Sequence, residues 1–156
     1  MSREELERVL REELHLNEVA PGVWVGRTTI PGLTAMQPFL IMVRLLDHAV
    51  AVAINLGLQV DRNHEAVYEY LLEVNGRIAL GEFFVDDEDR ISMGAEMPCR
   101  EDSHSYFSQE ELVVMMKVLF DAVKDHYNRI LQLIHGGERR GPRDLLSWLK
   151  TARERR

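Results

Sequence analysis

The sequence predicts an α+β fold in which helices flank an antiparallel β-sheet, in the order α-β-β-β-α-β-β-α, with a further helix in a C-terminal tail. Two features support this prediction: three segments repeat apolar residues at helical spacing, and the segments between them alternate as strands do. At 156 residues the chain fits one domain with its own core. We expect an α+β body over residues 1–137 and a basic tail helix over residues 138–156.

The first helix is expected at residues 3–16. Ser2 and Glu5 have the spacing of a capping box, and the apolar residues that follow recur every three or four positions. A Pro-Gly pair ends this segment. We expect a strand over residues 23–30, which a second Pro-Gly pair closes.

An almost continuous apolar stretch follows, PFLIMVRLLDHAVAVAINLGL, residues 38–58. A polar Asp-His pair interrupts it, and alanines alternate with β-branched residues in its second half, which favours a hairpin of strands 39–46 and 50–56 over one buried helix. We expect the alanine face to lie against a helix, because small side chains permit a close approach. The branched face would then pack on something thicker.

The second helix is expected to begin after Asp61 or Asn63, either of which can cap it, and to end at an Asn-Gly pair. Strands over 78–85 and 91–97 follow. Four acidic residues, 86–89, join these strands. A calcium loop of the EF-hand type needs alternating oxygen ligands, a central glycine and a distal Glu, none of which is present, so we interpret them as a hairpin turn.

The longest helix is expected at residues 109–135, where Ser108 and Glu111 form a second capping box. A helix of 27 residues is about 40 Å long and overhangs a small domain. Its apolar stripe continues to the end, so we expect the tail or a second copy of the chain to cover the overhang. This length and the apolar strands predict a homodimer.

The tail follows a glycine-rich stretch, GGERRG, residues 136–141, which follows a helix and therefore lacks the strand–loop–helix context of a phosphate-binding loop. We interpret it as a hinge. In the tail, Leu145, Trp148 and Leu149 form one apolar stripe among basic residues. We expect this stripe to dock on the acidic body or on a dimer mate.

Composition and charge exclude several classes of protein. The net charge of −7 argues against nucleic acid as a main partner, since phosphate binding needs a basic surface. Seven Lys and Arg against three acids give the chain from Gly136 onward +4, which leaves −11 for residues 1–135. The sequence contains no run of about 18 apolar residues, which is the length that a membrane-spanning helix needs. A charged N-terminus without an apolar region and a single cysteine, Cys99, predict a cytoplasmic protein.

The residues YEYLLEVNGRIALGEFFVDDEDRISMGAEMP, 68–98, resemble the YbjN family, which has the fold of type III secretion chaperones. In this segment, a helix that ends in Leu-Leu-x-x-Asn leads into a strand, an acidic hairpin and a second strand, and SQEEL at residues 108–112 adds to the likeness. The resemblance covers about residues 1–135. It implies a dimer or a partner-binding module with a regulatory role, and it carries over no catalytic residue.

Two classes of function follow. The first is a non-catalytic, chaperone-like module without a cofactor or metal, which binds a protein or peptide through an apolar surface. Methionines adapt to varied partners, although they also fill cores. The residues that we expect to bind a partner are Met93, Met97, Met115, Met116, Leu145, Trp148 and Leu149. The alternative is a small enzyme whose site assembles from Cys99, Asp102, His104 and the carboxylates of the 86–89 turn.

Overall fold

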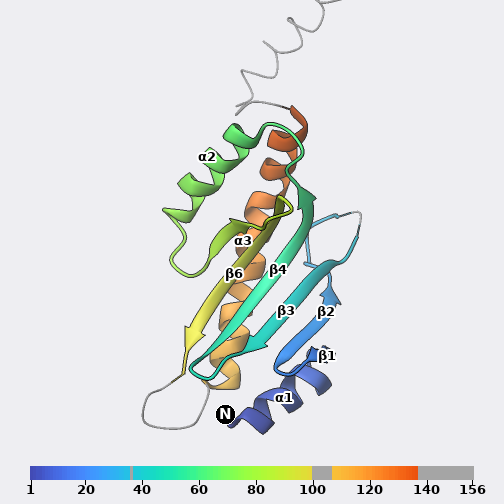
Figure 1. Ribbon diagram of the computed structural model, residues 1–156, viewed down its shortest axis with the longest axis vertical. Coiled ribbons are helices and arrows are strands. Elements are labelled where there is room, and N and C mark those ends of the chain that lie inside the picture. The colour runs from blue at the N-terminus through green and yellow to red at the C-terminus, as the bar shows by residue number, and fades with distance from the viewer. Residues whose placement is uncertain (36, 100–106, 137–156) are drawn as a thin grey trace, which may run out of the picture.

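Three helices and six strands make up the described part of the chain (Figure 1). The computed structural model describes residues 1–35, 37–99 and 107–136. The elements in chain order are α1 (Arg3–Glu12), β1 (Asn17–Ala20), β2 (Val23–Thr28), β3 (Phe39–Leu45), β4 (Ala49–Gln59), α2 (His64–Asn75), β5 (Glu82–Val85), β6 (Arg90–Pro98) and α3 (Gln109–Gly136). The predicted α+β class is confirmed.

The strands form a single antiparallel sheet in the order β1-β2-β3-β4-β6-β5. The first four strands are neighbours in both sequence and space. After β4 the chain passes through α2, reaches the far edge of the sheet as β5, and returns as β6 beside β4. The sheet therefore has two edge strands, β1 and β5, which are the shortest strands of the structure at four residues each.

Local side-chain bonds fix where the helices begin. Both predicted capping boxes are present: Ser2 and Glu5 bond reciprocally at α1, and so do Ser108 and Glu111 at α3. Asn63 precedes α2, but its side chain makes no cap bond there. Its amide instead donates to the carbonyl oxygens of residues 133 and 134, at the end of α3.

The two largest differences between expected and observed boundaries are of four residues each. The first helix ends at Glu12 instead of residue 16. It is followed by a strand, β1, which was not predicted from the sequence. All four side chains of β1 are exposed, so its sequence lacks the alternation of apolar and polar residues by which a strand is recognised. The strand expected from residue 78 begins only at Glu82, because backbone bonds from Arg77 and Ile78 to Val74 extend the end of α2 into a turn.

The core lies between one face of the sheet and the helices. α3 runs behind the sheet along its strands, while α2 and α1 lie near opposite ends of the molecule (Figure 1). Val50, Val52 and Ile54 of β4 are buried on this face. The expectation that the alanine face would contact a helix is wrong: the β-branched face does so, because its larger side chains fill the space between the sheet and α3.

α3 has 28 residues, and its apolar stripe is covered within the chain over its whole length. Leu112 near its start and Leu133 and Ile134 near its end are all at most 2% exposed. One of the two grounds for predicting a homodimer, an uncovered overhang, is therefore absent from the described residues.

Candidate binding surface on the open face of the sheet

The second face of the sheet has no helix in front of it among the described residues (Figure 1). Strand β3 shows the contrast between the faces most clearly, because its side chains alternate strictly between buried and exposed. Ile41 and Val43 point into the core, whereas Leu40, Met42 and Arg44 point to the open face. Leu40 and Met42 are 39% and 37% exposed, which is unusual for apolar residues of a central strand.

Register places the open-face residues in rows that cross the strands. One row consists of Met42, Ala53, Gly94 and Glu82. The next consists of Leu40, Asn55, Ser92 and Phe84. In the first row, the two inner strands carry the smallest residues and the two outer strands carry long ones. Small residues therefore form a floor on β4 and β6, between taller side chains on β3 and β5.

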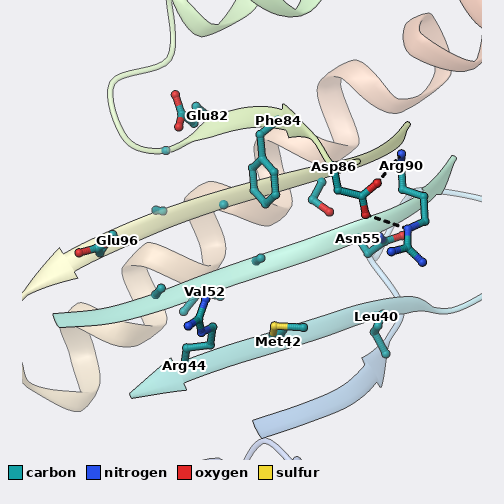
Figure 2. A pocket seen from close by; sticks show the side chains of 16 residues that line it. Leu40, Met42, Arg44, Val52, Asn55, Glu82, Phe84, Asp86, Arg90 and Glu96 are labelled. Carbon is teal, nitrogen blue, oxygen red and sulfur yellow. Dashed lines mark hydrogen bonds and ion pairs between the residues drawn. The ribbon is translucent and has the colours of Figure 1, made fainter. Parts of the chain in front are cut away.

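This hollow, which we call the trough, has a volume of about 690 Å³ (Figure 2). Its floor is formed by Ala51, Ala53, Ser92 and Gly94; one rim by Leu40, Met42 and Arg44; the other rim by Glu82, Phe84 and Asp86. The rim strands are three strand spacings apart, or about 14 Å. An α-helix with its side chains is about 10–12 Å across, so the face between the axes of β3 and β5 has about the width of one helix that lies along the strands, in contact with the Phe84 ring where it leans over β6.

Gly94 is required for the shape of the trough. A Cβ atom at this position would lie 2.9 Å from the ring of Phe84 and 3.0 Å from the carbonyl oxygen of Val52. The Phe84 ring therefore lies over the glycine, an arrangement that stabilises glycine in a strand. Phe84 nevertheless remains 40% exposed and forms the apolar part of its rim.

Charges lie around this apolar centre. At one end, the backbone N–H of Arg90 donates a hydrogen bond to the Asp86 carboxylate and lowers the pKa of Asp86, and the Arg90 guanidinium, which bonds the same carboxylate at 2.8 Å, lowers it further. Elsewhere on the trough, Glu82 and Glu96 are exposed, and within the described part of the chain neither forms an ion pair. The trough thus offers apolar contact together with two carboxylates that form no ion pair with another described residue, and with one cation, Arg44, on the rim opposite Glu82.

The free edge of β5, beside the trough, is closed to strand addition at its centre. The Asn75 side chain accepts a hydrogen bond from the N–H of Phe83 at 2.7 Å and donates one to its carbonyl oxygen at 2.8 Å. These are the two groups through which an added strand would pair. A partner is therefore better received on the face of the sheet than at this edge.

The expected partner-binding methionines lie mostly inside the molecule. Met93, Met115 and Met116 are at most 6% exposed and pack in the core, and Met97 is half-buried on the helix side of β6. Met42, which the expectation did not include, is the methionine on the trough. The other three expected residues, Leu145, Trp148 and Leu149, lie outside the described residues.

The structure separates the groups of the enzymatic alternative. The acidic turn 86–89 and Cys99 lie at opposite ends of β6, whose nine residues span about 30 Å. Burial raises the pKa of the Cys99 thiol, which is the opposite of what activates a nucleophile. Asp102 and His104 lie outside the described residues. The predicted site around Cys99 and the turn carboxylates is therefore not assembled.

The acidic turn joins β5 to β6, as predicted. The Asp86 carboxylate accepts hydrogen bonds from the N–H groups of Glu88 and Arg90. The hydroxyl of Tyr68 on α2 donates to Asp89 at 2.7 Å, which ties the turn to the helix and raises the pKa of Tyr68. In the ranges that the structure describes, no three His, Cys, Asp or Glu residues are placed to hold a metal ion together.

Fold and surface together define an α+β protein with one sheet face left open. The chain belongs to the YbjN family: the family model, described as "Putative bacterial sensory transduction regulator", matches residues 27–132. This confirms the family that residues 68–98 predict. None of the curated proteins compared with the chain matches it.

Among the solved structures to which the chain is similar is that of the heterodimeric complex ExoU–SpcU from the type III secretion system of Pseudomonas aeruginosa. A chain of that complex is 18% identical, and the match covers 80% of this chain and 94% of that chain with a TM-score of 0.48. A likeness at this level carries no argument about function. Separately, none of the helices among the described residues is long and apolar enough to cross a membrane.

Proposed function

We propose that this protein is a non-catalytic, chaperone-like binding module that holds an amphipathic helix of a partner protein in the trough. The observation that carries the proposal is the shape of the open face, with a floor of small residues between a rim that contains Leu40 and Met42 and a rim in which Phe84 lies between two acidic residues. Helices that bind in grooves bury one apolar stripe and leave their polar sides in water. The family description, a regulator of sensory transduction, agrees with a protein that acts by binding another.

The rim charges suggest which helices fit. Glu82 and Glu96 form no ion pair with another described residue, so a helix with Lys or Arg on the side that faces them, and not on the side that faces Arg44, is favoured over an acidic one. Such pairing mainly determines selectivity and the rate of association, whereas the apolar contact supplies affinity. The single cysteine of the chain supports a cytoplasmic setting for this activity.

The test uses two matched substitutions of exposed apolar residues. Met42→Arg places a cation on the trough rim, and Val114→Arg places one on α3, where Val114 is 59% exposed and away from the trough. Each variant is used to capture proteins from a lysate of the source cells, with quantitative mass spectrometry. We expect a partner that the wild type and Val114→Arg retain alike and that Met42→Arg retains at least tenfold less. Equal retention by all three would contradict the proposal.

Self-association is a second part of the proposal. Leu40, Met42 and Phe84, which line the trough together, leave exposed apolar surface of the kind that interfaces cover. We expect sedimentation equilibrium to report a mass near twice the 18.1 kDa of one chain. A single species of 18.1 kDa at tens of micromolar would show that the module acts as a monomer.

A further inference from the structure

We propose that the chain's own C-terminal tail, residues 138–156, occupies the trough when no partner is bound. The inference rests on the proposed function, because it assigns an internal occupant to the same surface. Three observations on the described residues carry it: where α3 ends, how far the following residues can reach, and how the chemistry of the tail matches that of the trough.

The end of α3 lies at the same end of the sheet as the acidic turn. The Asn63 side chain donates hydrogen bonds to the carbonyl oxygens of Leu133 and Ile134, at 3.2 and 2.9 Å. A few residues earlier, the N–H of Val60 bonds the carbonyl oxygen of Asp89 at 2.8 Å. The chain therefore leaves Gly136 close to the end of the trough that Asp86 and Arg90 form.

The distance to the trough is within reach of the chain. Eight residues, from 137 to 144, precede the apolar stripe of the tail, and they extend up to about 28 Å. Layers of secondary structure pack about 10 Å apart, so these residues are long enough to pass from the helix layer around the end of the sheet. Gly137, Gly141 and Pro142 favour changes of direction along this path.

The chemistry of the tail is complementary to the trough. Leu145, Trp148 and Leu149 are spaced to form one stripe on a helix, which matches a surface that is apolar along its centre. Lys150 and Arg153 come directly after this stripe in the sequence, so in the proposed arrangement they meet the carboxylates of the trough. The net charges of the two parts of the chain are also opposite, since the chain from Gly136 onward carries +4 and the remainder −11.

A tail in the trough makes binding competitive. A partner helix must displace the tail, so its apparent affinity is reduced by the fraction of molecules in which the trough is occupied. The tail then restricts binding to partners that match the trough better than it does, and it covers Leu40, Met42 and Phe84 while the protein is alone.

The chain provides a specific probe for this contact, because Lys150 is the single lysine of the tail and the two others, Lys117 and Lys124, lie on α3. A carbodiimide joins a lysine amine directly to a nearby carboxylate. In the full chain, we expect mass spectrometry to find Lys150 joined to Glu82 or Glu96. Met42→Arg should reduce these links at least tenfold, and Val114→Arg should not. Absence of the links, or equal links in both variants, would overturn the inference.

Mixing chains labelled with ¹⁵N and unlabelled chains before the reaction identifies whose tail is bound. Linked peptides with both parts light or both heavy support docking within one chain. Mixed pairs would show that a second copy supplies the tail and would overturn the proposal as stated.

A Trp148→Ala chain separates this inference from the proposed function. It leaves the trough intact but removes the largest apolar contact of the tail. We expect it to lose the Lys150 links and to retain at least threefold more partner in the capture experiment. Unchanged partner retention would reject the tail as a competitor while leaving the proposed function standing. If neither the wild type nor any variant captured a partner whose retention depends on Met42, the proposed function itself would be rejected.

Discussion

Two rows of residues cross the same four strands on opposite faces of the sheet. On the covered face the row is Ile41, Ile54, Met93 and Phe83, and on the open face it is Met42, Ala53, Gly94 and Glu82. Every side chain of the covered row is at most 4% exposed. The residues are adjacent in sequence, yet one row fills the space beneath α3 and the other leaves space unfilled. The covered face contributes to the stability of the fold, whereas we propose that the open face contacts an occupant.

The largest expected difference between the rows concerns their methionines. Met93→Ala should lower the free energy of unfolding by about 2–5 kcal/mol, because it leaves a cavity beneath α3. Met42→Ala should change it by no more than about 0.5 kcal/mol, as surface substitutions do. Urea unfolding of the two variants measures both values. Equal losses would mean that the open face is part of the packed core and would break the comparison.

A smaller effect is expected at the glycine of the open row. Gly94→Ala forces the Phe84 ring and the backbone of Val52 apart, and overpacking of this kind typically costs about 1–3 kcal/mol. Chemical denaturation of Gly94→Ala, Phe84→Ala and the double variant sharpens the point. The double variant should be more stable than the sum of the single changes allows, because removal of the ring relieves the clash. Strict additivity would contradict the contact.

Acid should affect the covered side through His126. Its Nδ1 lies 2.7 Å from the Tyr70 hydroxyl, and burial lowers the pKa of His126 although Asp125 partly opposes this effect. The unfolded chain therefore takes up a proton near pH 6.5 while the folded chain does not, so stability should fall as the pH drops below about 6.5. Unfolding midpoints measured between pH 8 and 5 test this. His126→Gln should flatten the dependence, and an equal slope in that variant would assign it to another group.

The smallest effect is expected at the acidic turn, at one end of the open face. Replacing Asp86, Asp87 and Glu88 with Asn, Asn and Gln should leave the unfolding midpoint nearly unchanged, since exposed ion pairs contribute little. Calorimetric titration with calcium and magnesium should give no saturable heat in either protein. A saturable signal that the variant loses would replace the hairpin interpretation with a metal site.

The sequence predicted those parts of the fold that are encoded locally. Capping boxes and helical periodicity placed α1 and α3, and the alternation within residues 50–56 correctly indicated a strand. The alanines of this strand were wrongly expected to face a helix. An alternation of period two divides the side chains of a strand between two faces, but it does not indicate which face a helix covers. Strand β3 indicates the two faces better. There Leu40, Met42 and Arg44 on the open face alternate with Phe39, Ile41, Val43 and Leu45, which are buried.

The trough itself could not be predicted from local patterns. Its floor and rims come from four strands whose register depends on β5 being placed at the edge and β6 beside β4. Met42, Ala53, Gly94 and Glu82 are separated by up to 52 positions in the sequence and meet only through that pairing. Methionines chosen by residue type alone were consequently assigned to a surface although three of them fill the core.

The central claim, that the open face is covered by a helix of the tail or of a partner, is tested most directly by placing a photoreactive diazirine side chain at position 42 of the full chain. The same group at position 114 provides the control. We expect irradiation to join position 42, and not position 114, to residues 144–150 in the purified protein and to a partner protein in cells. Cross-linking at position 42 no greater than at position 114 in both settings would contradict the account.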